Sequence, residues 1–256
     1  MSDPHGRFVW YELMTPDPDG ATRFYPNVVG WGTRRWDGPT PYTMWANGET
    51  TIGGVWGIDE YMQSQGVQPH WLPYIGVRDV DATAAQAARL GAMVVREPAD
   101  IPDVGRFAVL RDPQGAVFAI FGSSRGQPPM DEAPPRVGDV SWHELLTTDH
   151  AAAFDFYHQL FGWEKTSDFD MGAMGTYQMY GKGDRTYGGM FDKTPDMPVP
   201  PNWLCYVKVD DVSRAVEAVT RNGGTVINGP MEVPGGDWIA QCVDPQGAPF
   251  ALHGTR

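Results

Sequence analysis

The chain has 256 residues, of which 41% are hydrophobic and 20% are charged, and its formal net charge is −13 at pH 7. The length and composition are those of one large or two ordinary globular domains. The acidic balance argues against nucleic acid and anionic membrane surfaces as partners, because both attract clustered lysine and arginine.

The start of the chain lacks the basic segment and long apolar run of a secretory leader, and apolar runs such as AVFAIFG (116–122) are too short to span a bilayer. Cys205 and Cys242 form no CxxC pair, which favours buried thiols in a reducing compartment. We therefore expect a cytoplasmic protein, either a monomer or a homodimer, whose partner is a small molecule.

Within the first half of the chain, the same order of predicted strands and helices occurs twice. The strand-like run RFVWYELMT leads into a helix over 17–28 that ends at Gly30, and strands follow near 32–37, 41–47 and 50–58. The strand HWLPYIGVRD then leads into a helix that ends at Gly91, and strands follow near 93–97, 106–111 and 116–121. Each pass is a βαβββ unit.

The second half repeats the first. The motif DPQGA occurs at 112–116 and again 132 residues later at 244–248, and the same offset maps Trp10-x-Glu12-Leu13 onto Trp142-x-Glu144-Leu145. Similarity over this length indicates a tandem duplication. The predicted domains are 1–121 and 139–256, joined by a linker over 122–138 that is rich in proline and glycine.

The repeat predicts an α+β fold with four βαβββ units, because each unit must pair with another to cover its sheet. We expect the paired units to form curled mixed sheets around clefts. The sequence leaves open whether a cleft forms within each half or between the halves, and which half is active.

The motifs of this repeat resemble those of the vicinal oxygen chelate superfamily. The residues that carry the resemblance are FY…GW closing the first helix, V.DV before the second helix and DP.G before the last strand. That superfamily includes glyoxalase I, extradiol dioxygenases and bleomycin-resistance proteins. More narrowly, the chain looks like two-domain actinobacterial proteins of secondary metabolism labelled glyoxalase-like or hydroxylase.

The resemblance implies where a metal would bind, and those positions hold no metal-binding side chains. The first-strand position falls on Trp10 and Trp142, and the eighth-strand position falls on Ala119 and Ala251. The fifth-strand position falls near Leu72 and Leu204, and the fourth strand offers glycine pairs with Trp56 or Phe191. Because such side chains do not bind divalent metals, we expect neither the usual metal centre nor another cofactor.

Strand alternation then predicts which side chains face a cleft. The candidate proton-transfer groups are Glu12, Glu144 and His253, the last of which has no counterpart in the first half. A carboxylate without a partner in such a place would have a raised pKa; alternatively, both glutamates are structural. The expected ligand-binding residues are Trp10, Trp142, Trp45, Trp56, Phe121, Met14, Tyr177 and Met190.

The leading hypothesis is a metal-independent enzyme that acts on a flat, mostly apolar small molecule, such as an aromatic secondary metabolite. Its proton transfer would use a cleft carboxylate or histidine. The alternative is a non-catalytic protein that binds and sequesters such a molecule, as resistance proteins do. A third hypothesis, a metal-dependent lyase or dioxygenase, is disfavoured by the missing ligands.

Overall fold

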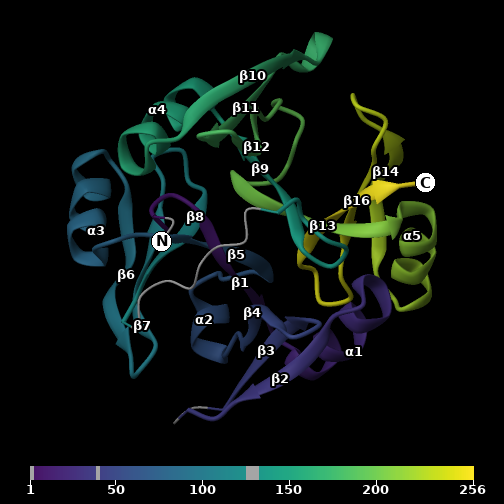
Figure 1. The fold of residues 1–256 in the computed structure, drawn as a ribbon, viewed down its shortest axis with the longest axis horizontal. Coiled ribbons are helices and arrows are strands. Elements are labelled where there is room, and N and C mark those ends of the chain that lie inside the picture. Colours follow the sequence, from purple (N-terminus) through teal and green to yellow (C-terminus); the bar gives the residue numbers. More distant parts are fainter. Residues whose placement is uncertain (1–2, 39–40, 125–132) are drawn as a thin grey trace. The chain divides into compact units, whose positions relative to one another are not determined.

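The computed structural model describes residues 3–38, 41–124 and 133–256. Four βαβββ modules follow one another along the chain (Figure 1). Module 1 contains β1 (Phe8–Thr15), α1 (Pro18–Val29), β2 (Gly32–Trp36), β3 (Tyr42–Asn47) and β4 (Thr50–Gly57). After the short helix α2 (Glu60–Ser64), module 2 contains β5 (His70–Gly76), α3 (Val80–Arg89), β6 (Met93–Ile101), β7 (Gly105–Arg111) and β8 (Val117–Ser123).

The second half repeats these modules. Module 3 contains β9 (Val140–Thr147), α4 (His150–Phe161), β10 (Glu164–Asp170), the 3-10 turn η1 (Gly172–Met174), β11 (Thr176–Lys182) and β12 (Arg185–Asp192). Module 4 contains β13 (Asn202–Asp211), α5 (Val212–Arg221), β14 (Thr225–Glu232), β15 (Trp238–Val243) and β16 (Pro249–Thr255). No helix in the described part of the chain is long and apolar enough to cross a membrane.

Each half forms one mixed eight-stranded sheet, with the order β2-β3-β4-β1-β5-β8-β7-β6 in the first half and β10-β11-β12-β9-β13-β16-β15-β14 in the second. Identical strand order in the two halves confirms the predicted α+β duplication. Local sequence signals explain the helices: Asp17, Asp79, Asp149 and Asp211 each cap a helix by accepting a backbone N–H three residues on.

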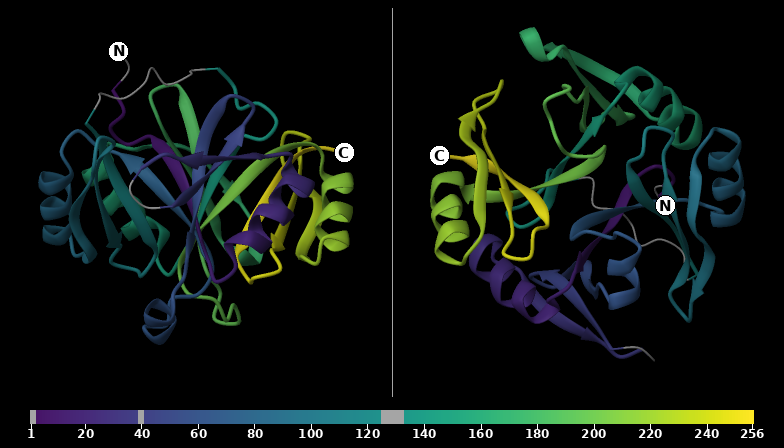
Figure 2. Two further views of the ribbon diagram at one scale, coloured as in Figure 1. Left: turned by 90° about the horizontal axis from the view of Figure 1, so that it is seen from below. Right: turned by 180° about the vertical axis from the view of Figure 1, so that it is seen from behind.

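The compact units do not coincide with the two sequence halves. Unit 1 consists of residues 1–9, 73–133 and 142–203, and so combines modules 2 and 3. Unit 2 consists of residues 10–72, 134–141 and 204–256, and so combines modules 1 and 4. Within these units α3 lies beside α4 and α1 lies beside α5 (Figure 2). Of the predicted linker, residues 125–132 lie outside the described residues.

The repeated DPQGA turn holds each unit together through its aspartate. In unit 2, Asp244 accepts the backbone N–H groups of Gln246 and Ala248 at 2.9 and 2.8 Å, and the Tyr25 hydroxyl donates to its other oxygen at 3.0 Å. Trp71 in turn donates to the Tyr25 oxygen at 2.9 Å. The chain Trp–Tyr–Asp therefore joins α1 to the last turn of the other half.

Unit 1 contains the same arrangement with the halves exchanged. Asp112 accepts the backbone N–H groups of residues 114–116, and the Tyr157 hydroxyl donates to it at 2.9 Å. Trp203 donates to the Tyr157 oxygen at 3.2 Å. Burial raises the pKa of both tyrosines well above the usual value, and the neighbouring aspartate raises it further, so both phenols remain hydrogen-bond donors.

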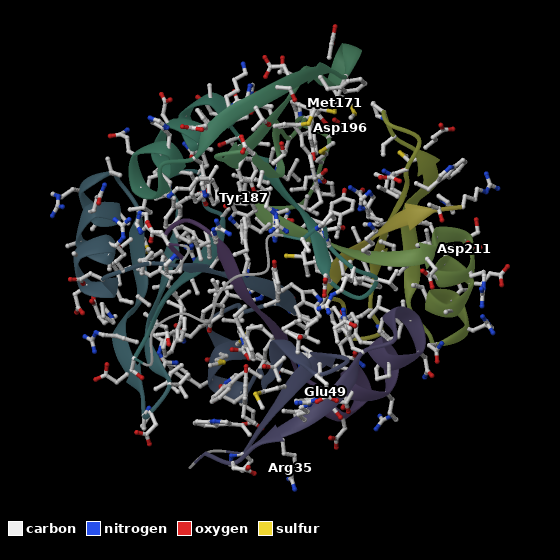
Figure 3. The ribbon with its side chains drawn as sticks, viewed as in Figure 1. Arg35, Glu49, Met171, Tyr187, Asp196 and Asp211 are labelled. Carbon is white, nitrogen blue, oxygen red and sulfur yellow. The ribbon has the colours of Figure 1, made fainter. Side chains whose placement is uncertain are left out.

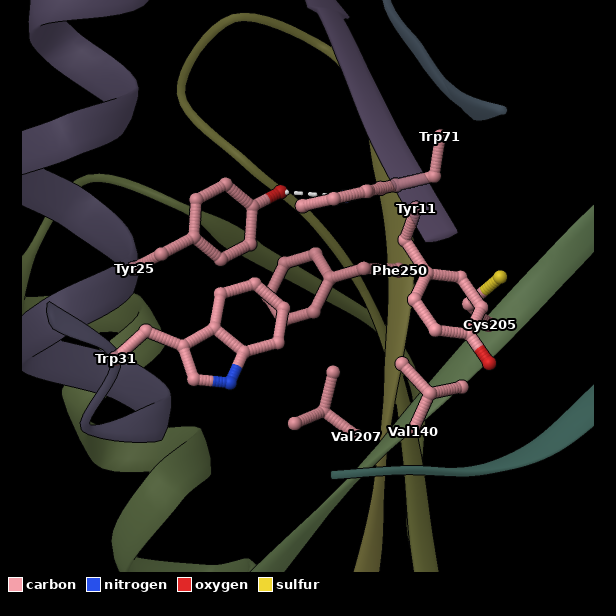
Figure 4. Close-up of a pocket in the computed structure, with 8 residues that line it drawn as sticks. All are labelled: Tyr11, Tyr25, Trp31, Trp71, Val140, Cys205, Val207 and Phe250. Carbon is pink, nitrogen blue, oxygen red and sulfur yellow. Dashed lines mark hydrogen bonds between the residues drawn. The ribbon is translucent and has the colours of Figure 1, made fainter. Parts of the chain in front are cut away.

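Two further pairs of repeated tryptophans, Trp31/Trp163 and Trp71/Trp203, lie in the core. Trp31 and Trp163 are 2% and 0% exposed, and each donates its indole N–H to a backbone carbonyl at 2.7 Å. Beside Trp31 and Trp71 lies a void of about 10 Å³, lined by apolar side chains and Tyr25 (Figure 4). A void of this size has room for at most one water, so it is a packing defect of the core and no ligand site.

Charged side chains cover the outer strands of unit 2. Figure 3 shows Arg35 on β2 and Glu49 in the turn between β3 and β4, and Arg34 donates to Glu49 at 2.8 Å. The Glu49 side chain is 98% exposed. An ion pair this exposed contributes little to stability.

Acidification is expected to destabilise the protein through His143, a buried residue of unit 1. Its ring stacks on Phe8 with centroids 3.6 Å apart, and its Nδ1 lies 2.9 Å from the Tyr187 carbonyl oxygen. Burial lowers the pKa of His143 to about 3. The His143 ring binds a proton more tightly in the unfolded chain than in the folded protein. Its contribution to folding stability is therefore complete above the unfolded pKa and is lost as pH falls from about 6.5 towards 3.

Between pH 7 and pH 5 this group accounts for a loss of roughly 2 kcal/mol of unfolding free energy. Urea denaturation across this range measures the change. His143→Phe retains a flat ring beside Phe8 and removes the titrating group, so its stability should fall less steeply over the same interval. Equal slopes in the two proteins would contradict the assignment.

Candidate functional site

The first candidate site is a hydrogen-bonded triad of Trp10, Tyr42 and Glu12 on one face of module 1. Trp10 Nε1 donates to the Tyr42 oxygen at 3.1 Å, and the Tyr42 hydroxyl donates to Glu12 Oε1 at 2.7 Å. Glu12 is 8% exposed, whereas the adjacent Leu13 is fully buried in the core cluster of unit 2. Strand alternation thus separates a polar face from the core face, as the sequence predicts.

The direction of the hydrogen bonds in this triad follows from the donors. An indole N–H can only donate, so the tyrosine oxygen accepts from Trp10 and its own proton points at the carboxylate. The O–H···O distance of 2.7 Å is in the usual range for a hydroxyl hydrogen bond. Such a chain can pass a proton between the phenol oxygen and Glu12.

Module 3 contains the equivalent triad of Trp142, Tyr177 and Glu144. Trp142 Nε1 donates to the Tyr177 oxygen at 2.8 Å, and the Tyr177 hydroxyl donates to Glu144 Oε2 at 3.0 Å. Glu144 is 8% exposed, the same fraction as Glu12. The duplication therefore extends to these side-chain contacts, with one triad in unit 2 and one in unit 1.

Glycines make room for both tyrosine rings. Gly54 is the register partner of Glu12, and Gly189 is the register partner of Glu144. A Cβ at Gly54 would overlap the Tyr42 hydroxyl, and one at Gly189 would overlap the Tyr177 ring. The absence of a side chain at Gly54 and Gly189 thus makes room for a phenol beside each glutamate.

Aromatic side chains surround the first triad. The Tyr42 ring lies 6.2 Å from Trp56 and 6.3 Å from Trp36, measured between centroids. Trp56 is 38% exposed and pairs in register with the half-buried Met14. Around the second triad, Phe191 stacks on Tyr177 at 5.7 Å but is only 9% exposed. The first triad therefore presents the larger accessible aromatic surface.

Two expected ligand-binding residues, Trp45 and Met190, lie in the core and not on the face that carries the triads. Trp45 is fully buried, and its ring packs against Tyr25, Trp31 and Trp71 in the core of unit 2. Met190 is also fully buried, because it pairs in register with the core residue Leu145. The prediction that they contact a ligand is wrong: each lies one residue out of phase with the face that carries the tyrosine.

His253 forms its hydrogen bonds with Ser141 and Asp237, neither of which belongs to a triad. Its Nδ1 lies 2.8 Å from Ser141 Oγ, and its Nε2 lies 3.0 Å from Asp237 Oδ2, all within unit 2. Phe121, the equivalent residue of the first half, is half-buried on β8 and pairs in register with Phe107. Whether Phe121 contacts a ligand stays a prediction.

The side chains present do not fit the metal centre that the family resemblance implies. Trp10 uses its only polar hydrogen on Tyr42, and Leu72, Ala119 and Ala251 are buried residues without donor atoms. Across residues 3–38, 41–124 and 133–256, no three histidine, cysteine, aspartate or glutamate side chains gather closely enough to hold a metal ion. We therefore derive no step through a metal.

Sequence reasoning missed Tyr42, the central residue of the first triad. Tyr177 lies 135 residues after Tyr42, the same shifted offset that relates Gly53-Gly54 to Gly188-Gly189. Applying that offset to the expected ligand-binding residue Tyr177 would have found it. Ser141 and Asp237 carried no such signal, because their first-half equivalents are Val9 and Gly105.

Both halves of the chain match models of known families. Residues 139–252 match the Glyoxalase/Bleomycin resistance protein/Dioxygenase superfamily, and residues 10–121 match a glyoxalase-like domain. The chain belongs to this superfamily. Its solved members include a Mn(II)-bound glyoxalase from Novosphingobium aromaticivorans, which aligns over 98% of this chain and 82% of that one with a TM-score of 0.67 and 14% identity.

A second superfamily structure, the 2,3-dioxygenase LapB from Pseudomonas sp. KL28, covers 98% of this chain and 93% of its own with a TM-score of 0.68 and 14% identity. At this identity the likeness shows the fold alone. It extends over both halves of the chain.

Two sequence relatives are more similar. A protein of Mycobacterium tuberculosis (strain CDC 1551 / Oshkosh) named "Putative glyoxylase CFP32" is 45% identical over 118 residues, which is 45% of this chain and 44% of that protein. The alignment thus spans less than half of this relative. The anthracycline biosynthesis protein DnrV of Streptomyces peucetius is 28% identical over 98% of this chain and 94% of its own length. Together these relatives support a small-molecule enzyme or binding role.

Proposed function

We propose that the protein is a metal-independent enzyme that acts on a flat, mostly apolar aromatic molecule with acidic hydroxyl groups. The observation that carries the proposal is the duplicated Trp–Tyr–Glu triad, whose tryptophans, Trp10 and Trp142, stand at the position of the first expected metal ligand. The relative named for anthracycline biosynthesis supports the substrate class, because anthracyclines contain fused aromatic rings.

In this proposal different side chains of module 1 stack on the ligand, exchange its proton and position the tyrosine. The exposed face of Trp56 stacks on the ligand ring and excludes water from one side of it. The Tyr42 oxygen then exchanges a proton with a ligand hydroxyl or an acidic carbon, while Glu12 takes or returns the tyrosine proton. Trp10 is a positioning residue, since its N–H fixes the direction in which the tyrosine donates.

The alternative function is non-catalytic binding of the same class of molecule. The near-identity of the two triads favours it, because structural hydrogen bonds are kept in both copies of a duplicated domain more readily than a reaction centre is. Both functions predict an aromatic ligand and differ in whether a proton moves.

A hydroxyanthraquinone such as 1,4-dihydroxyanthraquinone separates the two functions, because its visible absorption shifts to the red when a hydroxyl ionises. For the full chain we expect quenching of tryptophan fluorescence and a red shift of the bound probe. In the double variant Tyr42→Phe/Tyr177→Phe we expect affinity within about fivefold of wild type, since one hydrogen bond contributes about 1 kcal/mol or less, and no red shift.

Tyr61→Phe is the matched control, because Tyr61 lies on α2 and is 72% exposed. Binding by the wild type without a red shift would favour sequestration over proton transfer. Absence of binding to any fused-ring probe would contradict both functions.

The two cysteines support a reducing compartment for this activity. Cys205 and Cys242 are buried and unpaired, and burial raises the pKa of each thiol to about 12, which keeps both thiols protonated and unreactive. We include a cytoplasmic location in the proposal on this basis.

A further inference from the structure

A second cluster of reactive side chains lies in unit 2 and consists of Ser141 on β9, His253 on β16 and Asp237 immediately before β15. Ser141 Oγ is 2.8 Å from His253 Nδ1, and His253 Nε2 is 3.0 Å from Asp237 Oδ2. The histidine ring thus bridges a hydroxyl and a carboxylate. We propose that this Ser141 cluster is an acyl-transfer site that accepts the acyl group of small esters, with Ser141 as the nucleophile.

The carboxylate determines which nitrogen of His253 carries the proton. An ionised Asp237 can only accept, so the neutral imidazole places its proton on Nε2 and donates it to the aspartate. Nδ1 is then an acceptor, 2.8 Å from the serine oxygen. The Tyr206 carbonyl oxygen is the other acceptor of the serine proton, but it lies farther away, at 3.3 Å. This division of roles is that of a serine, a general base and an orienting acid.

The Ser141 cluster is specific to the second half of the chain. The equivalent residues of the first half are Val9, Phe121 and Gly105, none of which has a titratable or nucleophilic side chain. The first half has the same strand order without these three side chains, so maintenance of the fold does not require them. Their joint presence in one copy points to a chemical role.

The cluster lies opposite the core and within reach of solvent. Phe250 and Leu252, the neighbours of His253 on β16 that face the other way, are buried in the core cluster of unit 2. The side chains of His253 and Asp237 are 21% and 53% exposed, and Ser141 is half-buried. A small ester can therefore approach the serine from the solvent side.

The proposed step is a nucleophilic acyl substitution. Ser141 Oγ forms a bond to the ester carbonyl carbon while its proton passes to His253 Nδ1, and the carbonyl–alkoxide bond then breaks. The leaving alcohol takes the proton from His253, which leaves a neutral imidazole and an acyl-serine. Water cleaves the acyl-serine by the same route and releases the carboxylic acid. The step is independent of the Tyr42 and Tyr177 triads and goes beyond the proposed function.

The test uses p-nitrophenyl acetate, an activated ester that needs little help from the protein to lose its alcohol. We expect the full chain to release p-nitrophenolate in a burst and to carry an acetyl group on Ser141, located by mass spectrometry of its peptides. Ser141→Ala should abolish this adduct. His253→Phe, which installs the first-half residue, should slow acylation roughly 10²–10⁴-fold, and Asp237→Asn should slow it as well.

Ser167→Ala is the matched control, because Ser167 is an exposed serine on β10 and should leave acylation unchanged. Thermal melting of each variant separates loss of the nucleophile from loss of fold. The proposal is overturned if the acetyl group is found only on other residues. It is also overturned if a folded His253→Phe variant acetylates Ser141 at the wild-type rate.

Discussion

Replacing Asp244 with alanine is expected to lower the free energy of unfolding by roughly 3–5 kcal/mol, because the change leaves several buried donors without their acceptor. These donors are the Tyr25 hydroxyl and the backbone N–H groups of Gln246 and Ala248. Tyr25 also accepts a hydrogen bond from Trp71, so the buried hydrogen-bond series from Trp71 through Tyr25 loses its final acceptor. Chemical denaturation of the full chain measures the loss.

Two comparisons make this result specific. Tyr25→Phe removes one donor and keeps the turn, so it should cost about 1–3 kcal/mol. Asp112→Ala removes the equivalent carboxylate of unit 1 and should cost about as much as Asp244→Ala. A loss below about 1 kcal/mol for both aspartate variants would contradict the role assigned to the DPQGA turn.

The contribution of the DPQGA aspartates to folding stability changes with pH in the opposite direction to that of His143. Burial raises the pKa of Asp244 and of Asp112 above the usual value, although their hydrogen bonds act in the other direction. A raised folded-state pKa means that the contribution to stability is complete below the unfolded pKa, near 4, and is lost as pH rises through the folded value. The aspartates therefore offset part of the acid destabilisation due to His143.

Cutting the chain between its sequence halves is expected to prevent either half from folding as a monomer. Residues 1–128 contain modules 1 and 2, but the packing partners of those modules are modules 4 and 3. Each fragment thus supplies one part of two cores and completes neither. We expect the separate fragments to be unfolded or to self-associate, and their mixture to recover the cooperative melting of the full chain.

Size-exclusion chromatography and circular dichroism of the fragments 1–128 and 129–256 measure this outcome. We expect self-association because a second copy of one half provides tyrosines and aspartates equivalent to those of the missing half. A monomeric fragment that melts cooperatively near the temperature of the full chain would show that the halves, and not units 1 and 2, are the folding units.

Much of the fold followed from the sequence, because the duplication repeats every element in order. The sequence did not show that module 1 packs with module 4 and module 2 with module 3. Tyr25 could equally bond to Asp112 or to Asp244, since both aspartates stand in the same DPQGA motif, and the structure selects Asp244. When a duplicated chain offers two identical partners, local sequence does not distinguish them.

The candidate site was predictable only in part, for reasons of strand geometry. Alternation from Trp10 correctly placed Glu12 opposite the core residue Leu13. Alternation from Trp10 does not extend to β3, where Trp45 is fully buried in the core cluster of unit 2. The Ser141 cluster joins three segments that are far apart in sequence, so no local motif indicates it.

In the proposed function the two triads bind and deprotonate an aromatic ligand without a metal. Titration of the full chain with 1,4-dihydroxyanthraquinone after dialysis against a chelator, with elemental analysis of the same sample, tests this most directly. We expect the red shift and the affinity of the metal-free protein to equal those before dialysis. A red shift that disappears with the metal and returns when Mn²⁺ or Fe²⁺ is added would contradict the claim.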